Sequence, residues 1–282
     1  MRKSTIGIVI LSIIVVGMII PIGFSGQVDP VVVTYGETTY ANSAYKNTVD
    51  TFFKNQAHAD LGNANSKVIT ASEVNKIAST ITGKTYGSNQ IFSSALVDLN
   101  DNDNLEVSVD KSKITTITGD MYLSALKSAG ITKGHVYVTS PVTATGESAL
   151  AGIMNSYEVA TNVEIPDTVK EAANNEIYTQ AEIVKNSNVS SEKLSDMVDD
   201  VKETVKEENV TDHQTIVNII QNYTVINNIN ITNSDIENLA TTIEQIQNVQ
   251  GDINNYESQM SDVLNGTNTT DSAKGLFDGL FN

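Results

Sequence analysis

The chain has 282 residues and a formal net charge of -17, from 34 acidic against 17 basic residues. Such a surface repels phosphate groups, and no local cluster of lysine and arginine offsets the repulsion, so we expect no nucleic-acid partner. The absence of cysteine excludes disulfides, thiolate metal sites and cysteine nucleophiles. No cofactor is expected.

The N-terminal stretch has the composition of an export signal. Basic residues at positions 2 and 3 precede a predominantly apolar run over residues 6–20, which Pro21 and Gly23 end. The run is longer than most signal-peptide cores and shorter than the roughly 20 residues of a full membrane span. Residues 1–27 are therefore predicted to be a signal peptide cleaved after Ser25 or, as the length favours, a membrane anchor through residues 6–24. Either places the rest of the chain outside the cytoplasm.

Residues 28–160 alternate between the periodicities of strands and helices and predict a mixed α/β head with a small sheet. A β-branched run over residues 31–34 predicts a strand, and apolar residues at helical spacing over residues 40–53 predict an amphipathic helix. A short strand at residues 68–69 follows. Thr70 or Ser72 is placed to cap the next helix, which includes residues 74–81.

Two further apolar runs, residues 91–99 and 105–109, flank a stretch of turn-forming residues. Short strands joined in this way are typical of an antiparallel hairpin. The tip is rich in oxygen ligands, but the calcium-loop pattern needs glycine where Asp103 stands and glutamate where Val109 stands. A solvated hairpin tip is the preferred interpretation. The weak metal candidates are Asp98, Asn100, Asp101 and Asp103.

A helix between two strands predicts a parallel crossover in the same head. Thr118 is placed to cap a helix that buries one side of residues 121–126 and ends at Gly130, and residues 135–138 predict the next strand. His135 begins this strand. No serine, aspartate or second histidine stands at a spacing that the sequence alone connects to it.

Residues 141–158 predict a turn followed by a helix. Thr143 or Thr145 is expected to cap a helix that opens at Gly146, and small residues at 149, 151 and 152 allow a neighbour to approach closely. The turn has no nucleophile elbow, because Leu150 stands where the motif G-x-S-x-G requires its second glycine. Structural capping is therefore the prediction.

These spaced segments resemble the domain-of-unknown-function family 1002. The resemblance rests on SSALV at residues 93–97, ITTITGDMYLSALKSAGI at 114–131, VYVTSPVTATGESALAGIMNSYE at 136–158 and, more loosely, VVVTYGE at 31–37. The chain departs from the family at Thr143 and Glu147, where members more often show a Val-Ser-Gly-Thr turn. Members are typically exported proteins of bacteria and archaea. The resemblance thus implies export and a shared fold, and it supplies no catalytic residues.

Residues 161–282 carry amphipathic helical patterns and predict an all-α region. Pro166 precedes the first helix, Ser190 or Ser191 caps the second, and Asp212 starts the third. The second helix is highly charged, which we interpret as a solvated face. Its acidic residues are Asp199, Asp200, Glu203, Glu207 and Glu208, with Lys202 and Lys206 interleaved.

Ser234 opens the longest periodic segment, which extends to residue 264 and would be about 45 Å long if unbroken. A bundle helix or a short intermolecular coil fits this pattern, and Gly251 is the predicted kink. The terminal sequence GLFDGLF is expected to dock on the bundle, because no basic face accompanies its apolar side. The expected fold class is α+β: a mixed head, then an all-α helical region, behind an N-terminal hydrophobic helix.

Six sequons of the form N-x-[ST] fall in the second half of the chain. The abundance of asparagine and threonine accounts for much of this number, and surface glycosylation outside the cell is the hypothesis they support. The sequons begin at Asn188, Asn209, Asn222, Asn230, Asn265 and Asn268.

No catalytic constellation is recognisable, so three functions stay open. The leading prediction is a non-catalytic, exported or membrane-anchored protein of the cell envelope that binds a cell-surface protein or glycan, or self-associates. The second is an extracellular hydrolase or wall-modifying enzyme with Asp98, Asp101, Asp120 and Glu158 as candidate acids and bases. The third is a solute-binding module with its pocket between head and helical region. Two facing buried carboxylates would favour the enzyme, an apolar cavity the binder, and a convex polar head the interaction protein.

Overall fold

The computed structural model describes residues 30–62, 64–82, 85–100 and 104–265. The predicted signal or anchor at residues 1–27 lies outside the described residues, and so do Asp101, Asp103, Asn268 and the terminal GLFDGLF. Within the described part of the chain, no helix has both the length and the apolar character needed to cross a membrane.

Within these described ranges, five strands form one sheet in the order β2-β1-β3-β5-β4. Only β3 runs against its neighbours, since β1 pairs with β2, and β4 with β5, in parallel. The predicted crossover from β4 through a helix to β5 is therefore confirmed. The strands are β1 (Val31–Gly36), β2 (Asn65–Ile69), β3 (Ser94–Asp98), β4 (Leu105–Val109) and β5 (Gly134–Thr139).

The predicted hairpin between β3 and β4 is wrong, because β5 lies between them. β3 pairs on one side with β1 and on the other with β5, where Leu96 stands opposite Tyr137. The two sequences explain the order: SALVD is buried along nearly its whole length, whereas LEVSV alternates and is only partly buried. A strand that is apolar on both faces suits the middle of a sheet, and an alternating strand suits its edge.

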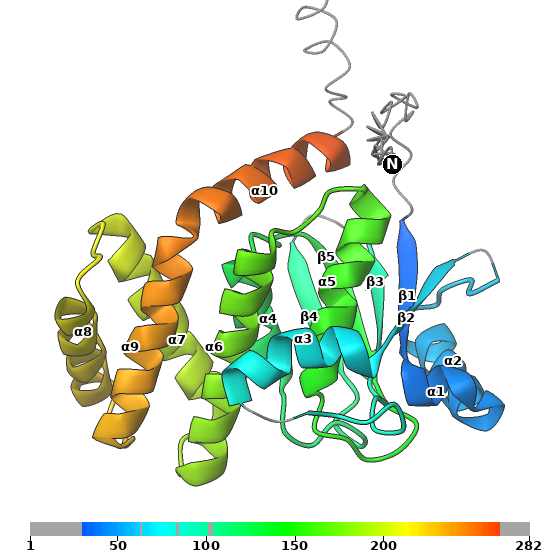
Figure 1. Cartoon of the computed structure of the whole chain (residues 1–282), viewed down its shortest axis with the longest axis horizontal. Helices are drawn as coiled ribbons and strands as arrows, with labels where there is room; N and C mark the ends of the chain where they lie inside the picture. Colours follow the sequence, from blue (N-terminus) through cyan, green and yellow to red (C-terminus); the bar gives the residue numbers. More distant parts are fainter. Residues whose placement is uncertain (1–29, 63, 83–84, 101–103, 266–282) are drawn as a thin grey trace, which may run out of the picture.

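Helices cover both faces of the sheet (Figure 1). On one face, Val49 and Phe53 of α2 form a core cluster with Val33, Tyr35 and Leu96 of the strands. On the other face, α4 packs against β4, α5 packs against β1 and β3, and α3 lies across α5 and α6. The helices of the head are α1 (Glu37–Ala41), α2 (Ser43–Gln56), α3 (Ala71–Thr82), α4 (Gly119–Ser128) and α5 (Glu147–Thr161).

The helix predicted over residues 40–53 is divided at Asn42, whose side chain accepts hydrogen bonds from the backbone N–H groups of Ala44 and Tyr45. This bond pattern caps α2 and separates it from the short α1. The predicted Thr118 cap of α4 is confirmed by its bond from Met121 N. For α3, Thr70 rather than Ser72 accepts from a first-turn N–H.

The predicted threonine cap of α5 is wrong, because Gly146 occupies the N-cap position with φ +99° and no side-chain cap. A Cβ at Gly146 would lie 2.7 Å from the Tyr122 hydroxyl, so glycine is needed there for space as well as for its conformation. The predicted close approach at Gly152 is confirmed: a Cβ there would stand 3.0 Å from Thr34 Cγ2 of β1. Small residues thus let α5 press against the sheet.

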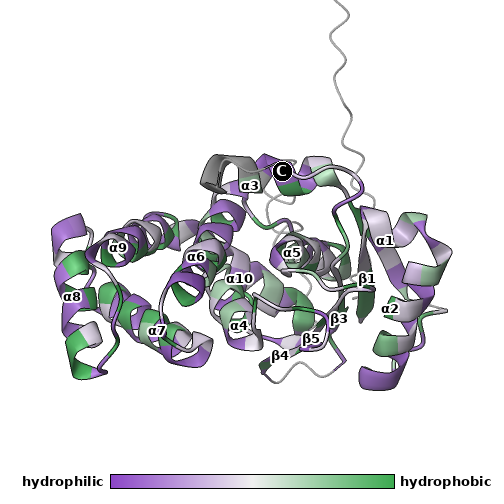
Figure 2. Cartoon of the chain, turned by 90° about the horizontal axis from the view of Figure 1, so that it is seen from below, coloured by the Kyte–Doolittle hydropathy of each residue, from purple (hydrophilic) through white to green (hydrophobic). Residues whose placement is uncertain are grey.

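Among the residues that the structure describes, five helices follow the head, and seen from below α6 lies between the head and the layer of α7, α8 and α9 (Figure 2). The predicted caps Ser190 and Asp212 are confirmed, each accepting from a first-turn N–H. α9 is capped by Thr232 in a capping box with Asp235, two residues before the predicted Ser234. The helices are α6 (Asp167–Asn186), α7 (Ser191–Glu207), α8 (His213–Ile226), α9 (Asn233–Asn248) and α10 (Gln250–Leu264).

The long periodic segment is broken at Val249, two residues before the predicted kink at Gly251, and forms two helices, α9 and α10. The two halves pack mainly in different cores. Leu239 and Ile243 of α9 pack with α7 and α8, whereas Ile253 and Tyr256 of α10 pack with the sheet and its helices. Ile246 near the end of α9 already belongs to the cluster of the sheet and its helices, and the chain changes direction after it (Figure 1).

The core of the head continues into the helical region. One cluster of buried residues joins Val136 of the sheet to Ile177 of α6 and Tyr256 of α10, and a second cluster lies among α7, α8 and α9. α6 packs against α4 as well as against α9. The division of the chain into residues 1–27, 28–160 and 161–282 stays a prediction.

His213, the first residue of α8, connects α8 to α9. Its Nε2 lies 3.1 Å from Glu237 Oε2 and its Nδ1 lies 2.8 Å from Glu244 Oε2. These hydrogen bonds raise the pKa of His213 above its ordinary value, because both carboxylates favour the charged imidazolium. The protonated ring donates to both helix-α9 glutamates at once.

Candidate functional site

A pocket of about 920 Å³ lies where the head meets the helical region. Its lining comes from the start of β4, from α4 and from α7, α9 and α10, and we refer to it as the junction pocket. A volume of this size is within the range of small-molecule and peptide sites. Its apolar part consists of Leu105, Leu123, Val205, Ile243, Ile246 and Ile253.

α4 lies between the sheet and the helical region and contacts both. Its sequence GDMYLSALKS turns Met121 and Leu126 toward the sheet, where both are fully buried. Ser124 and Ser128 occupy another stripe, one helical turn apart, and meet α6 and α7. Helical spacing thus separates an apolar side against the sheet from a small polar side against the helical region.

A buried polar cluster of Ser124, Ser128, Glu176, Asp199 and Lys202 lies at the base of the junction pocket. The Lys202 ammonium is 2.9 Å from a carboxylate oxygen of Glu176 and 2.9 Å from one of Asp199, and it donates to Ser128 Oγ at 2.8 Å. Ser124 Oγ lies 2.5 Å from an oxygen of each carboxylate. Glu176 is completely buried and also contacts Ser128 Oγ. The cluster therefore joins α4, α6 and α7.

The electrostatics of this cluster favour the protonated form of Lys202. Burial alone would lower the pKa of Lys202, but Glu176 and Asp199 outweigh burial and raise it. In the same way, burial favours neutral Asp199, yet the ammonium of Lys202 holds the pKa of Asp199 below its ordinary value. The carboxylates that accept hydrogen bonds from Ser124 are both ion-paired to the Lys202 ammonium, which lowers their basicity. The cluster orders three helices and presents a compensated charge to the pocket.

The interpretation of the α7 charges as a solvated face is wrong for Asp199 and Lys202. The Lys202 side chain is only 13% exposed, whereas Asp200 and Glu203 are exposed. A signal for this burial exists in α6, where Glu176 and Gln180 stand four residues apart on an otherwise apolar side. Sequence alone does not connect that pair to a lysine 26 residues away.

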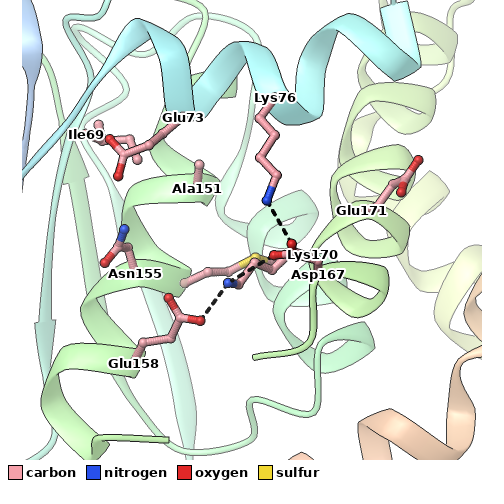
Figure 3. Close-up of a pocket in the computed structure, with 10 residues that line it drawn as sticks. Ile69, Glu73, Lys76, Ala151, Asn155, Glu158, Asp167, Lys170 and Glu171 are labelled. Atoms are coloured by element: carbon pink, nitrogen blue, oxygen red, sulfur yellow. Dashed lines mark hydrogen bonds and ion pairs between the residues drawn. The ribbon is translucent and has the colours of Figure 1, made fainter. Parts of the chain in front are cut away.

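A second, smaller pocket of about 200 Å³ lies between α3, α5 and α6 (Figure 3). Lys170 points toward Glu158 at 2.7 Å, and Lys76 toward Asp167 at 2.8 Å. Glu158 also accepts a hydrogen bond from the backbone of Ile165. These charges satisfy one another and fasten the start of α6 to the head.

The enzyme candidates are not brought into contact. Asp98 accepts from the backbone and side-chain nitrogens of Asn100, Asp120 is exposed in the first turn of α4, and Glu158 pairs with Lys170. Among the residues that the structure describes, no hydrogen bond or ion pair joins any two of the three, and Asp101 lies outside them. Within the same ranges, no group of three or more histidine, aspartate or glutamate residues is arranged to hold a metal.

β4 and β5 bring together residues that the sequence did not connect. Ser108 Oγ lies 2.9 Å from His135 Nε2, and the His135 ring stacks on Tyr137 with centroids 4.1 Å apart. His135 Nδ1 is 3.1 Å from the Tyr137 hydroxyl and 3.7 Å from Glu106 Oε2. The carboxylate is thus beyond hydrogen-bond range, and Tyr137 takes the place that a catalytic triad gives to an acid.

The described glycosylation candidates are all exposed, as that modification requires. Asn222 lies within α8, and the other four lie in the connections between helices or just after a helix. Glycosylation stays a prediction. The four are Asn188, Asn209, Asn230 and Asn265.

The chain belongs to the family described as "Protein of unknown function (DUF1002)", whose profile matches residues 35–263. The resemblance stated from the sequence is confirmed, and the match extends beyond the head through most of the helical region. The chain is also 28% identical over 155 residues to "Uncharacterized protein YpuA" of Bacillus subtilis (strain 168), an alignment that covers 55% of this chain and 53% of the relative. The chain thus spans about half the length of that relative. No solved structure matches the chain.

Proposed function

We propose that this protein is an exported, non-catalytic binding protein of the cell envelope and that the junction pocket is its ligand site. The observation that carries the proposal is the pocket of about 920 Å³ at the meeting of head and helical region. It combines an apolar part with a few polar side chains from several elements, which is the usual composition of a ligand site. This is the position that the solute-binding prediction requires.

The hydrolase receives less support from the same geometry. The two carboxylates that do face each other, Glu176 and Asp199, are bridged by Lys202 at 2.9 Å, so both are compensated. General acid and base catalysis needs one carboxyl that holds a proton and another that accepts one. Because Lys202 is ion-paired to both carboxylates, it favours the deprotonated form of both, and neither is set apart as the proton donor.

The envelope location rests on the basic pair at residues 2 and 3 and the apolar run over residues 6–20. If the leader is retained, residues 6–24 supply the membrane contact. We expect the native product in the membrane or outside the cell, with intact-mass measurement distinguishing a start at Gly26 from a full-length chain. Recovery of the full-length, untagged product in the cytosolic fraction would contradict this proposal.

Ligand binding is tested by native mass spectrometry of the protein purified from its own envelope fraction. We expect wild type to retain a bound molecule that Gln247→Trp has lost, because Gln247 lines the junction pocket and indole would fill it. The matched control is Asn248→Trp, at the next residue of α9, which is exposed and does not line the pocket. Wild type without any bound molecule, or equal occupancy in the Gln247 variant, would refute the assignment.

A further inference from the structure

We propose that the ligand of the junction pocket is a linear aliphatic polyamine, a chain of methylene groups that carries two or more ammonium groups. This inference rests on the proposed function and names the chemistry of its ligand. The pocket combines partly buried aliphatic side chains with carboxylates that no lysine of the described ranges neutralises. A polyamine offers the matching combination, because its methylene groups are apolar and its ammonium groups donate charge-assisted hydrogen bonds to carboxylates.

Two leucines of the lining are not fully buried by the protein itself. Leu105 of β4 and Leu123 of α4 are partly buried, whereas the other aliphatic residues of the lining are buried. Leu123 also belongs to none of the core clusters that the described residues form. Methylene groups of a ligand would cover these two side chains, and that burial of apolar surface favours binding.

The charges of the lining favour a cation. Lys127 and Lys202 are already paired with Asp199. The other charged side chains of the lining are three glutamates and one lysine, and none of these four forms an ion pair within the described part of the chain. The charge that remains for a ligand is therefore negative. The four residues are Glu203, Lys206, Glu207 and Glu257.

Two of these carboxylates stand at a spacing that suits a particular diamine. Glu203 and Glu207 are four residues apart on α7, which places them about 6 Å apart along the helix axis. Two ammonium groups joined by four methylene groups are also about 6 Å apart in an extended chain. Like charges at this helical spacing repel each other, so a bound diamine would relieve a repulsion as well as form two ion pairs. Glu257 of α10 adds a carboxylate from another wall of the pocket.

The lining gives less support to other cations. It contains no aromatic side chain, whereas sites for quaternary ammonium groups are usually aromatic cages. In the ranges that the structure describes, no group of three or more histidine, aspartate or glutamate residues is arranged to hold a metal ion. Primary and secondary ammonium groups are satisfied by hydrogen-bond acceptors, and Gln247 and Gln250 add amide oxygens to the glutamates.

Isothermal titration calorimetry of the purified wild-type protein tests the ligand class. The probes are spermidine, a triamine that contains the four-methylene spacing, and hexaamminecobalt(III), a compact ion of the same charge without methylene groups. At about 0.15 M salt, which screens distant surface charges, we expect spermidine to bind about tenfold more tightly, because only its methylene groups cover the leucines. Equal affinity of the two probes, or no binding of spermidine, would overturn the inference.

A pair of double variants tests the site. Glu203→Gln with Glu207→Gln removes two carboxylates of the lining and is expected to weaken spermidine binding about tenfold. The matched control is Asp196→Asn with Asp200→Asn, which removes two exposed carboxylates that are also four residues apart on α7 but lie outside the lining. The control should bind spermidine as wild type does. Equal losses in the two double variants would contradict the assignment, since binding would then follow net charge alone.

The native mass spectrum separates this inference from the proposed function. A bound molecule with the mass of a polyamine that Gln247→Trp has lost would support both. A bound molecule of another class that the same variant has lost would overturn this inference alone and leave the proposed function standing. Spermidine binding that Gln247→Trp leaves unchanged would overturn the placement of the polyamine in the junction pocket, because Gln247 lines it.

Discussion

Replacing Lys202 with methionine is expected to destabilise the protein strongly. Methionine retains much of the apolar stem but removes the ammonium that lies 2.9 Å from both Glu176 and Asp199. Glu176 is completely buried, so water does not replace the lost partner. Removing one partner of a buried ion pair costs about 3–5 kcal/mol. Because Asp199 keeps 30% of its side-chain exposure, we expect the lower end, about 3 kcal/mol.

Urea and thermal unfolding measure this loss, and for a chain of this size about 3 kcal/mol corresponds to a fall in Tm of about 6–12 °C. The matched control is Lys206→Met, one turn further along α7, where the lysine is exposed and the change should stay within about 0.5 kcal/mol. Adding Glu176→Gln to the Lys202 variant should restore part of the stability, since it removes the unpaired buried charge. Equal losses in the two lysine variants would refute the buried-cluster reasoning.

Further substitutions test three particular features of the fold. The raised pKa of His213 adds stability that is fully present below the ordinary pKa of 6.5 and is lost as pH rises through the folded-state pKa. The urea midpoint of wild type should therefore decrease as pH increases through that range, whereas the midpoint of His213→Gln should change less. Gly134→Ala should cost about 2 kcal/mol or more in chemical denaturation, because φ is +105° and a Cβ would lie 2.7 Å from a leucine methyl; Gly251→Ala, with nothing within 4 Å in α10, should instead stabilise by about 0.5 kcal/mol. Thr232→Ala should lower the free energy of unfolding by about 1 kcal/mol through loss of the α9 cap. An equal effect of Ser234→Ala would show that the cap was wrongly assigned.

The local elements were predictable because their signals are local. Strand β1, the Thr118 cap of α4 and the parallel crossover to β5 follow from side-chain periodicity and from residues within one turn. The cap of α5 was predicted wrongly because neighbouring residues offer more than one possible cap. Gly146 caps α5 without a side chain because the Tyr122 hydroxyl occupies the space beside it, and Tyr122 comes from another helix.

The candidate site was less predictable than the elements that build it. Lys202 looks like one of many solvated charges in a helix until α4 and α6 place serines and a buried glutamate against it. Ser108 and His135 are 27 residues apart and meet because their strands are adjacent. The partial burial of Val107 likewise depends on which strand stands at the edge.

The sequence by itself determined the acidic surface, the positions of most strands and helices, the family and the basis for expecting export, since each depends on composition or on residues near one another in the chain. The tertiary structure decided the insertion of β5 between β3 and β4, the break at Val249 and the ion pairs of Lys202. These depend on which surfaces remain to be buried once every element competes for the same core. Periodicity identifies an apolar side, and only packing selects its partner.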